Sequence, residues 1–215
     1  KNESPEKSTG TGDKSKNNSG ACEQIMEESM KGKAFRHFCT ITHHKLLVMK
    51  YCFRVGLYKQ GLLHDLSKYS PTEFKVGCKY YQGTRSPNNA EREDIGVSTS
   101  WLHHKGRNKH HFEHWVDYSL DKDHVIMGAQ MPRKYVAEMV MDRISASRNY
   151  LGDAYTDSQP LEYFMKSKED LWFIHPQTKK ELEALLRILN DHGEEKLLHY
   201  IKYRYLKGET RKIRY

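Results

Sequence analysis

The sequence predicts an all-α fold, and three observations carry this prediction. Apolar residues recur at helical spacing in most segments from about residue 22 onward, and runs with the alternating pattern of a strand are weak. Helix start and stop signals also divide the chain into segments of ordinary helix length. A chain of 215 residues is long enough for one domain with a real core. We therefore expect a single all-helical domain over residues 21–215.

The first twenty residues are predicted to form a disordered tail. They contain no large apolar side chain, so they cannot bury enough surface to offset the entropy lost on ordering. We expect residues 1–20 to pack against nothing.

The first helix is expected over residues 40–56. Helical spacing places Ile41, His44 and Val48 on one face of this segment and His43 on the opposite face. His44 is therefore expected to point into the core and His43 toward solvent.

A helical turn, GLLHDLSKY at residues 61–69, follows the first helix. The next helix opens at residues 70–73, Ser-Pro-Thr-Glu, which form a capping box with proline at the first helical position. Beyond it we expect a surface loop at 83–97, an interrupted helix at 101–118, a long helix from Pro132 to about Gly152, and helices at about 160–168, 176–191 and 194–206, with Gly193 separating the last two.

The net charge predicts the kind of binding partner, and the cysteine pattern predicts the cellular compartment. Lys and Arg outnumber Asp and Glu by 36 to 28, a net charge of +8, which favours phosphate-bearing partners from nucleotides to nucleic acids; alternatively the charge serves only solubility. The four cysteines show no CxxC spacing, which is typical of a reducing, cytoplasmic location. No apolar run is long enough to span a bilayer, so no membrane association is expected.

Four residues are candidates for one metal site: His44, the adjacent pair His64 and Asp65, and Asp142, which lies beside the apolar stripe of the long helix. An inward carboxylate without a partner costs several kcal/mol, so Asp142 requires an arginine, a hydrogen-bond cage or a metal. Mixed imidazole and carboxylate ligation suits Mn, Fe, Co, Ni or Zn better than Ca. Singly, each residue has another interpretation: a hydrogen-bonded core histidine, or an Asp142 paired with Arg143.

The string LLHDLSK resembles the HDIGK-type signature of the HD-domain superfamily of metal-dependent phosphohydrolases, and the order His44, His64-Asp65, Asp142 is similar to that superfamily's ligand order. The resemblance covers about residues 40–150, with a C-terminal helical extension at 155–207. It implies a helical fold, one or two divalent metals and hydrolysis of phosphate esters, often in nucleotides. The longer strings HDLSKYSPTEF and LHHKGRNKHH resemble a bacterial and phage family without an assigned activity.

Five histidines fall within residues 103–114, HHKGRNKHHFEH. If this segment is helical, His104 and His111 share one face, and His103, His110 and His114 share another. Dinuclear members of the resembled superfamily have further histidines between the HD pair and the last Asp, so His104 with His111 or His110 is a candidate for a second metal. The alternative is a surface histidine cluster.

We interpret the chain as a metal-dependent phosphohydrolase acting on a phosphate-bearing small molecule such as a nucleotide. Asp65 is expected to bind the metal and to orient the attacking water, and Lys68 to meet the phosphate, with Arg107 a weaker candidate. His103 or His110 is a candidate proton donor. One rival is a diiron oxygenase on the same scaffold. The other is a non-catalytic nucleic-acid-binding protein, suggested by the net charge, the 14 Tyr and the basic runs.

Overall fold

The structure is a computed structural model that describes residues 15–120 and 122–211. This part of the chain is built from eight α-helices and one two-stranded antiparallel sheet, which confirms the all-α class. The α-helices are α1 (Ser15–Arg54), α2 (Tyr58–Leu63), α3 (Pro71–Tyr80), α4 (Pro87–Ile95), α5 (Thr99–Arg107), α6 (Arg133–Leu151), α7 (Gln159–Ser167) and α8 (Pro176–Tyr200). The shorter elements are the 3₁₀ turns η1 (Leu66–Tyr69), η2 (Phe112–Trp115), η3 (Gly152–Ala154) and η5 (Leu206–Arg211), the π turn η4 (Ile201–Tyr205), and strands β1 (Val116–Tyr118) and β2 (Ile126–Gly128).

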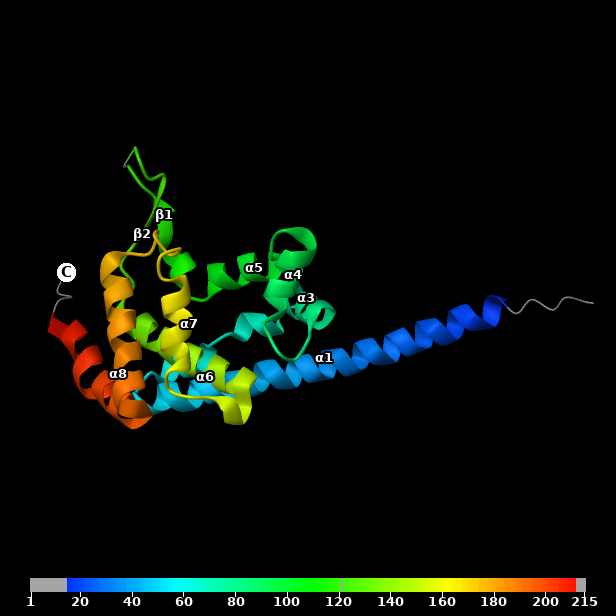
Figure 1. The fold of residues 1–215 in the computed structure, drawn as a ribbon, viewed down its shortest axis with the longest axis horizontal. Coiled ribbons are helices and arrows are strands. Elements are labelled where there is room, and N and C mark those ends of the chain that lie inside the picture. Colours follow the sequence, from blue (N-terminus) through cyan, green and yellow to red (C-terminus); the bar gives the residue numbers. More distant parts are fainter. Residues whose placement is uncertain (1–14, 121, 212–215) are drawn as a thin grey trace, which may run out of the picture.

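The hydrophobic core lies where α1, α6, α7 and α8 meet (Figure 1). Each of these helices turns an apolar stripe inward at helical spacing, as the sequence predicts for amphipathic helices. The fully or almost fully buried members include Val48 and Cys52 of α1, Val136, Val140 and Ile144 of α6, Phe164 of α7, and Leu182, Leu185, Leu186 and Leu189 of α8.

Helices α3, α4 and α5 form a second group beside the middle of α1 (Figure 1). The capping box predicted at the start of α3 is present in part, since the Ser70 hydroxyl accepts a hydrogen bond from the Glu73 backbone N–H. The side chain of Glu73 does not complete the box and is used elsewhere. Because His44 lies on α1, Asp142 on α6 and His104 on α5, the two groups of helices enclose the predicted site residues between them.

The elements expected over residues 83–97 and 101–118 differ from the structure. Residues 83–97 are not a loop, because Pro87 begins helix α4 at its first position and Gly96, in the left-handed region, ends it. The helix expected over residues 101–118 stops at Arg107, where Asn108 leaves helical geometry. The chain then makes the η2 turn and strand β1 instead.

Helix α1 begins earlier than the sequence predicts, and helix α8 is interrupted near its C-terminal end. Of the predicted disordered tail, residues 1–14 lie outside the described residues, whereas residues 15–20 are the first turns of α1, because extending an existing helix adds a hydrogen bond per residue without a new nucleation step. Near the other end, α8 loses helical geometry at Gly193, the position expected to separate two helices. Across residues 15–120 and 122–211, no helix is both long and apolar enough to cross a membrane.

Candidate metal centre

A strained turn carries the adjacent His64 and Asp65. Helix α2 ends just before it, and Asp65 has φ 53°, the only positive φ among the described non-glycine residues. The ammonium of Lys45, on α1, donates to the backbone oxygens of Leu62 (2.7 Å) and His64 (3.0 Å) and so anchors the turn. The sequence predicted this pair inside a helical segment. The actual turn instead points both side chains into the space between α1, α5 and α6, and such strain is common at functional sites.

The structure brings the four predicted residues His44, His64, Asp65 and Asp142 together. Their ligand atoms lie within 4.8 Å of one another. Nε2 of His44 lies 3.0 Å from Oδ1 of Asp142 and 3.7 Å from Oδ2 of Asp65. Nε2 of His64 lies 3.3 Å from the same Asp65 oxygen. His43, as expected, is exposed, and its ring contacts Asn149.

A second group uses the other oxygen of Asp65. Nε2 of His104 and Nε2 of His110 each lie 3.3 Å from Oδ1 of Asp65, and Nε2 of His111 lies 3.0 Å from Nε2 of His104. The sequence left His110 and His111 as alternatives, but both belong to this group. Because the helix ends at Arg107, helical projection does not apply to the two later histidines, and the turn after Asn108 brings both beside His104.

Behind the histidines lie two buried carboxylates that the sequence analysis did not identify as site residues. Oε1 of Glu138 lies 3.0 Å from Nδ1 of His64 and 3.2 Å from Nδ1 of His110. Glu73 contacts Nδ1 of His104 at 2.8 Å and Nδ1 of His103 at 2.6 Å. A carboxylate at Nδ1 fixes the proton there and leaves Nε2 as the electron-pair donor, the arrangement that supports metal-bound histidines.

The signal for Glu138 was present in the sequence, because it precedes Asp142 by one helical turn and therefore shares its face of α6. Glu73 was hidden by its second interpretation as part of the capping box. His103, which the sequence offered as a proton donor, is held by Glu73 outside both groups.

Five polar atoms at the centre of the two groups are buried and make no hydrogen bond within the described residues, although one of them, Oδ2 of Asp65, forms an ion pair with Lys68. They are Nε2 of His44, His64 and His110 and both carboxylate oxygens of Asp65. Ligands held at about 2.1 Å from one ion in tetrahedral geometry lie about 3.4 Å apart. Seven separations between ligand atoms of these groups lie at 3.0–3.7 Å and bracket this value. The residues present therefore fit a divalent cation in each group, with Asp65 shared between them.

The electrostatics of Asp65, Asp142 and His111 agree with this fit, whereas the carboxylates beside His64, His104 and His110 outweigh burial and raise the pKa of these three imidazoles. Burial disfavours ionisation of Asp65, yet the neighbouring His64 and Lys68 outweigh burial and hold the pKa of this carboxyl well below its usual range. Burial likewise opposes ionisation of Asp142, but the neighbouring rings of His44 and His64 keep its pKa well below the ordinary value. Burial, together with His110 and His104, lowers the pKa of His111, which keeps this imidazole in the neutral form that binds metals.

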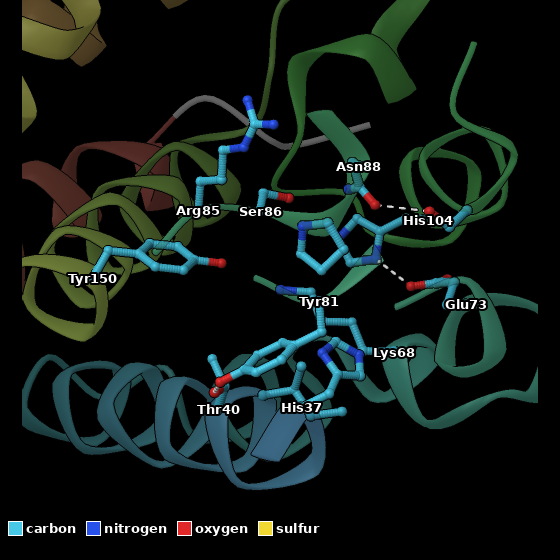
Figure 2. A pocket seen from close by; sticks show the side chains of 13 residues that line it. His37, Thr40, Lys68, Glu73, Tyr81, Arg85, Ser86, Asn88, His104 and Tyr150 are labelled. Carbon is cyan, nitrogen blue, oxygen red and sulfur yellow. Dashed lines mark hydrogen bonds and ion pairs between the residues drawn. The ribbon is translucent and has the colours of Figure 1, made fainter. Parts of the chain in front are cut away.

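The predicted catalytic Lys68 lies at the edge of the centre. Its Nζ is 2.7 Å from Oδ2 of Asp65, and it lines a cleft between α1, α3, α5 and α6 (Figure 2). Burial opposes the charged form of Lys68, but Asp65 and Asp142 raise its pKa above the ordinary value, so the side chain is an ammonium. Arg107, the weaker candidate, is exposed and donates to the backbone oxygen of His103. On another side, Trp101 covers His104 and His111 with ring centroids at 5.4 and 4.7 Å.

Comparison with known families gives one match. A sequence model described as a family of unknown function, DUF5662, matches residues 33–188. This span contains both groups of ligand atoms and the two carboxylates behind them. No curated protein and no solved structure matches the chain.

Proposed function

The chain belongs to the DUF5662 family, whose function is unknown, and we propose from the geometry of its site that it is a metal-dependent phosphohydrolase. The observation that carries the proposal is the position of Asp65. One of its oxygens faces His44, His64 and Asp142, and the other faces His104, His110 and His111. A carboxylate shared in this way suits two cations held side by side, an arrangement common among enzymes that hydrolyse phosphate esters. The resemblance to the HD signature agrees with this proposal and stays a prediction.

The metals would be divalent ions of the Mn, Fe, Co, Ni and Zn group, because both sets combine imidazole nitrogen with carboxylate oxygen. When bound, such ions lower the pKa of a coordinated water and polarise a phosphoryl oxygen. His44, His64 and Asp142 would hold one ion, and His104, His110 and His111 the other. Glu138 and Glu73 orient these ligands from behind.

In the hydrolysis, the water oxygen bonds to phosphorus while the ester P–O bond breaks. One proton passes to the leaving alcohol, and inorganic phosphate is the second product. Asp65, buried and ionised, is placed to orient the attacking water. Lys68 supplies a fixed positive charge beside it for the phosphoryl oxygens. His110 is no longer a candidate proton donor, because both of its nitrogens face carboxylates. Lys68 is a proton-bearing group that lines the cleft beside Asp65.

The test is a metal count and a hydrolysis assay on purified protein. Metal content is measured by mass spectrometry, and phosphate or nitrophenol release is followed from p-nitrophenyl phosphate and a set of phosphomonoesters with each candidate metal. Asp65→Asn is the matched variant, because asparagine tolerates the left-handed turn while removing the shared charge. We expect metal-dependent turnover in the wild type and none in the variant. Absence of hydrolysis with every metal would overturn the proposal.

A diiron oxygenase is the second candidate, favoured by the same pair of histidine-rich groups around Asp65. It is distinguished by the optical spectrum and oxygen consumption of anaerobically prepared, iron-loaded protein. Oxygen uptake without phosphate release would select the oxygenase. The nucleic-acid-binding alternative predicts a gel shift that weakens with salt and is unaffected by chelator.

A further inference from the structure

The cleft beside Lys68 is not explained by the metal ligands alone. It has a volume of about 60 Å³ and is lined by side chains from α1, η1, α3, α5 and α6 and from residues 81–88 (Figure 2). At about 10–15 Å³ for each water, this is room for roughly four to six water molecules. A ligand that fills it is therefore a small group.

Most of the lining side chains carry neutral hydrogen-bonding groups. Four of them have polar side-chain atoms for which the described residues supply no hydrogen bond: the hydroxyls of Tyr150 and Ser86, the amide nitrogen of Asn88 and Nδ1 of His37, of which Nδ1 of His37 is fully buried. His37 is 5% exposed, and Figure 2 shows the Tyr150 hydroxyl directed into the cleft. A buried polar atom such as Nδ1 of His37 normally has a partner. The half-buried hydroxyl of Tyr150 and amide of Asn88 line the same cleft, so together these groups point to a ligand rich in hydroxyl groups.

The charged residues that line the cleft further restrict the chemical class of its ligand. Glu73 is occupied by two histidines, and Arg85 is paired with Glu93 and Gln82. Lys68 is also paired, with Oδ2 of Asp65, but it is the cation beside the candidate metal ligands, where one phosphate group would fit. A nucleobase would need an open aromatic face. Tyr81 does not offer one, because its ring packs edge-on against His37 and its hydroxyl is bonded to Thr40. Tyr150 enters the cleft with its hydroxyl group first and so presents a hydrogen-bonding group to the ligand (Figure 2).

We propose that this cleft binds the hydroxylated carbon skeleton of a small sugar or polyol phosphate, with Lys68 at its phosphate and Tyr150, Asn88 and His37 at its hydroxyl groups. This inference rests on the proposed phosphohydrolase function and names its substrate class. The ester bond cleaved is the one between phosphorus and a hydroxyl oxygen of the sugar or polyol, which leaves as the free alcohol. A nucleoside monophosphate and a nucleic acid are the competing substrates.

The first experiment compares substrates on the metal-loaded wild type. Phosphate release is measured from glycerol 3-phosphate, a tetrose phosphate and adenosine monophosphate, with p-nitrophenyl phosphate as a monoester that has no hydroxyl groups for the cleft to bind. We expect a kcat/KM for the small polyol and sugar phosphates at least tenfold above that for the nucleotide. A preference for the nucleotide would overturn the inference and leave the phosphohydrolase proposal standing.

The second experiment tests the named residues. Tyr150→Phe and Asn88→Ala are each expected to raise KM for glycerol 3-phosphate about three- to tenfold, the effect of one neutral hydrogen bond, with little change for p-nitrophenyl phosphate. Tyr118→Phe, in an exposed position of strand β1, is the matched control. An unchanged KM in both cleft variants would overturn the assignment.

A third readout does not depend on turnover. Calorimetric titration of glycerol 3-phosphate into chelator-treated protein should show weaker binding by Tyr150→Phe than by the wild type and Tyr118→Phe. If no substrate is hydrolysed but this difference is present, the phosphohydrolase proposal fails and the assignment of the cleft survives. If the three proteins bind equally or not at all, the assignment fails.

Discussion

Oε1 of Glu138 accepts the hydrogen bond of the His64 ring at 3.0 Å, on the side of the imidazole that faces away from Asp65. The same oxygen lies 3.2 Å from Nδ1 of His110. His64 belongs to one group of ligand atoms and His110 to the other. A single buried carboxylate therefore orients one histidine in each half of the candidate centre.

Glu138→Leu is expected to weaken metal binding in both halves, by about 10- to 100-fold, because both rings lose the acceptor that fixes their Nδ1 proton. Glu138→Gln keeps an acceptor oxygen and should have a smaller effect. The measurement is calorimetric titration of Mn or Zn into chelator-stripped protein. Glu162→Gln, at an exposed position of α7, is the control. Wild-type affinity in Glu138→Leu would show that this carboxylate does not position the ligands.

Metal stoichiometry should separate the two halves. Wild type is expected to hold two ions for each chain, Asp142→Ala one and His111→Ala one, because each variant removes a ligand from only one group. Asp65→Asn, which alters the shared carboxylate, should lose both. Metal analysis after dialysis gives the counts. Two ions retained in Asp142→Ala and in His111→Ala would contradict the shared-carboxylate arrangement.

Loss of a metal ligand should also reduce the stability that the folded protein gains from metal. Metal that binds only the folded state stabilises it by RT ln(1 + [L]/Kd), on the order of 3–4 kcal/mol at several hundred-fold saturation. The rise in melting temperature on adding metal should therefore be smaller in Asp142→Ala than in wild type. With chelator present, Asp142→Ala should remain folded. A collapse of the chelated variant well below chelated wild type would instead identify Asp142 as a structural partner of His44.

His43 and His44 are neighbours on α1 that face opposite sides of the helix, so substitutions at the two positions can be compared directly. His44→Ala is expected to abolish binding in its half, because Nε2 of His44 faces both Asp142 and Asp65. His43→Ala should be mild, because His43 is exposed and contacts only Asn149 at 2.7 Å. Metal titration of both variants is the measurement, and equal losses would mean that the helix itself is disturbed.

Local periodicity predicted the part of the site that lies on regular helices. His44 and Asp142 follow helical spacing on α1 and α6, so their inward positions could be predicted from i, i+4 neighbours. The turn at Asp65 could not, because the left-handed conformation of an aspartate depends on the Lys45 contact across two helices. The position of His110 depends on where α5 ends, and the role of Glu73 on a contact between segments 30 residues apart.

A close approach between α1 and α3 gives a test of packing near the cleft. A Cβ atom added at Gly77 would lie 2.1 Å from Nε2 of His37. Gly77→Ala should therefore destabilise the fold by about 1–3 kcal/mol, the usual effect of overpacking. In the background of His37→Ala the same substitution should cost much less. Urea denaturation of the four proteins measures the coupling, and additive effects would exclude the contact as the cause.

The last prediction concerns the pH dependence of stability at His37. Burial first, and then the nearby Lys68, lower the pKa of this imidazole from 6.5 to about 4. Above pH 6.5 the ring is neutral in both the folded and the unfolded chain, so its contribution to stability is fully present. Between pH 6.5 and 4 the unfolded chain binds a proton that the folded chain does not, so the free energy of unfolding decreases as the pH falls.

His37→Gln cannot titrate, so the difference in unfolding free energy between wild type and this variant should shift in favour of the variant from about pH 7 to about pH 4.5. Urea denaturation in the presence of chelator measures it, and carboxylates and histidines common to both proteins cancel in the difference. His199→Gln, at an exposed histidine of α8, is the matched control. A difference that stays constant across this range would mean that His37 takes up its proton in the folded state, and therefore that its Nδ1 has a partner or solvent access that the buried position beside Gly77 does not provide.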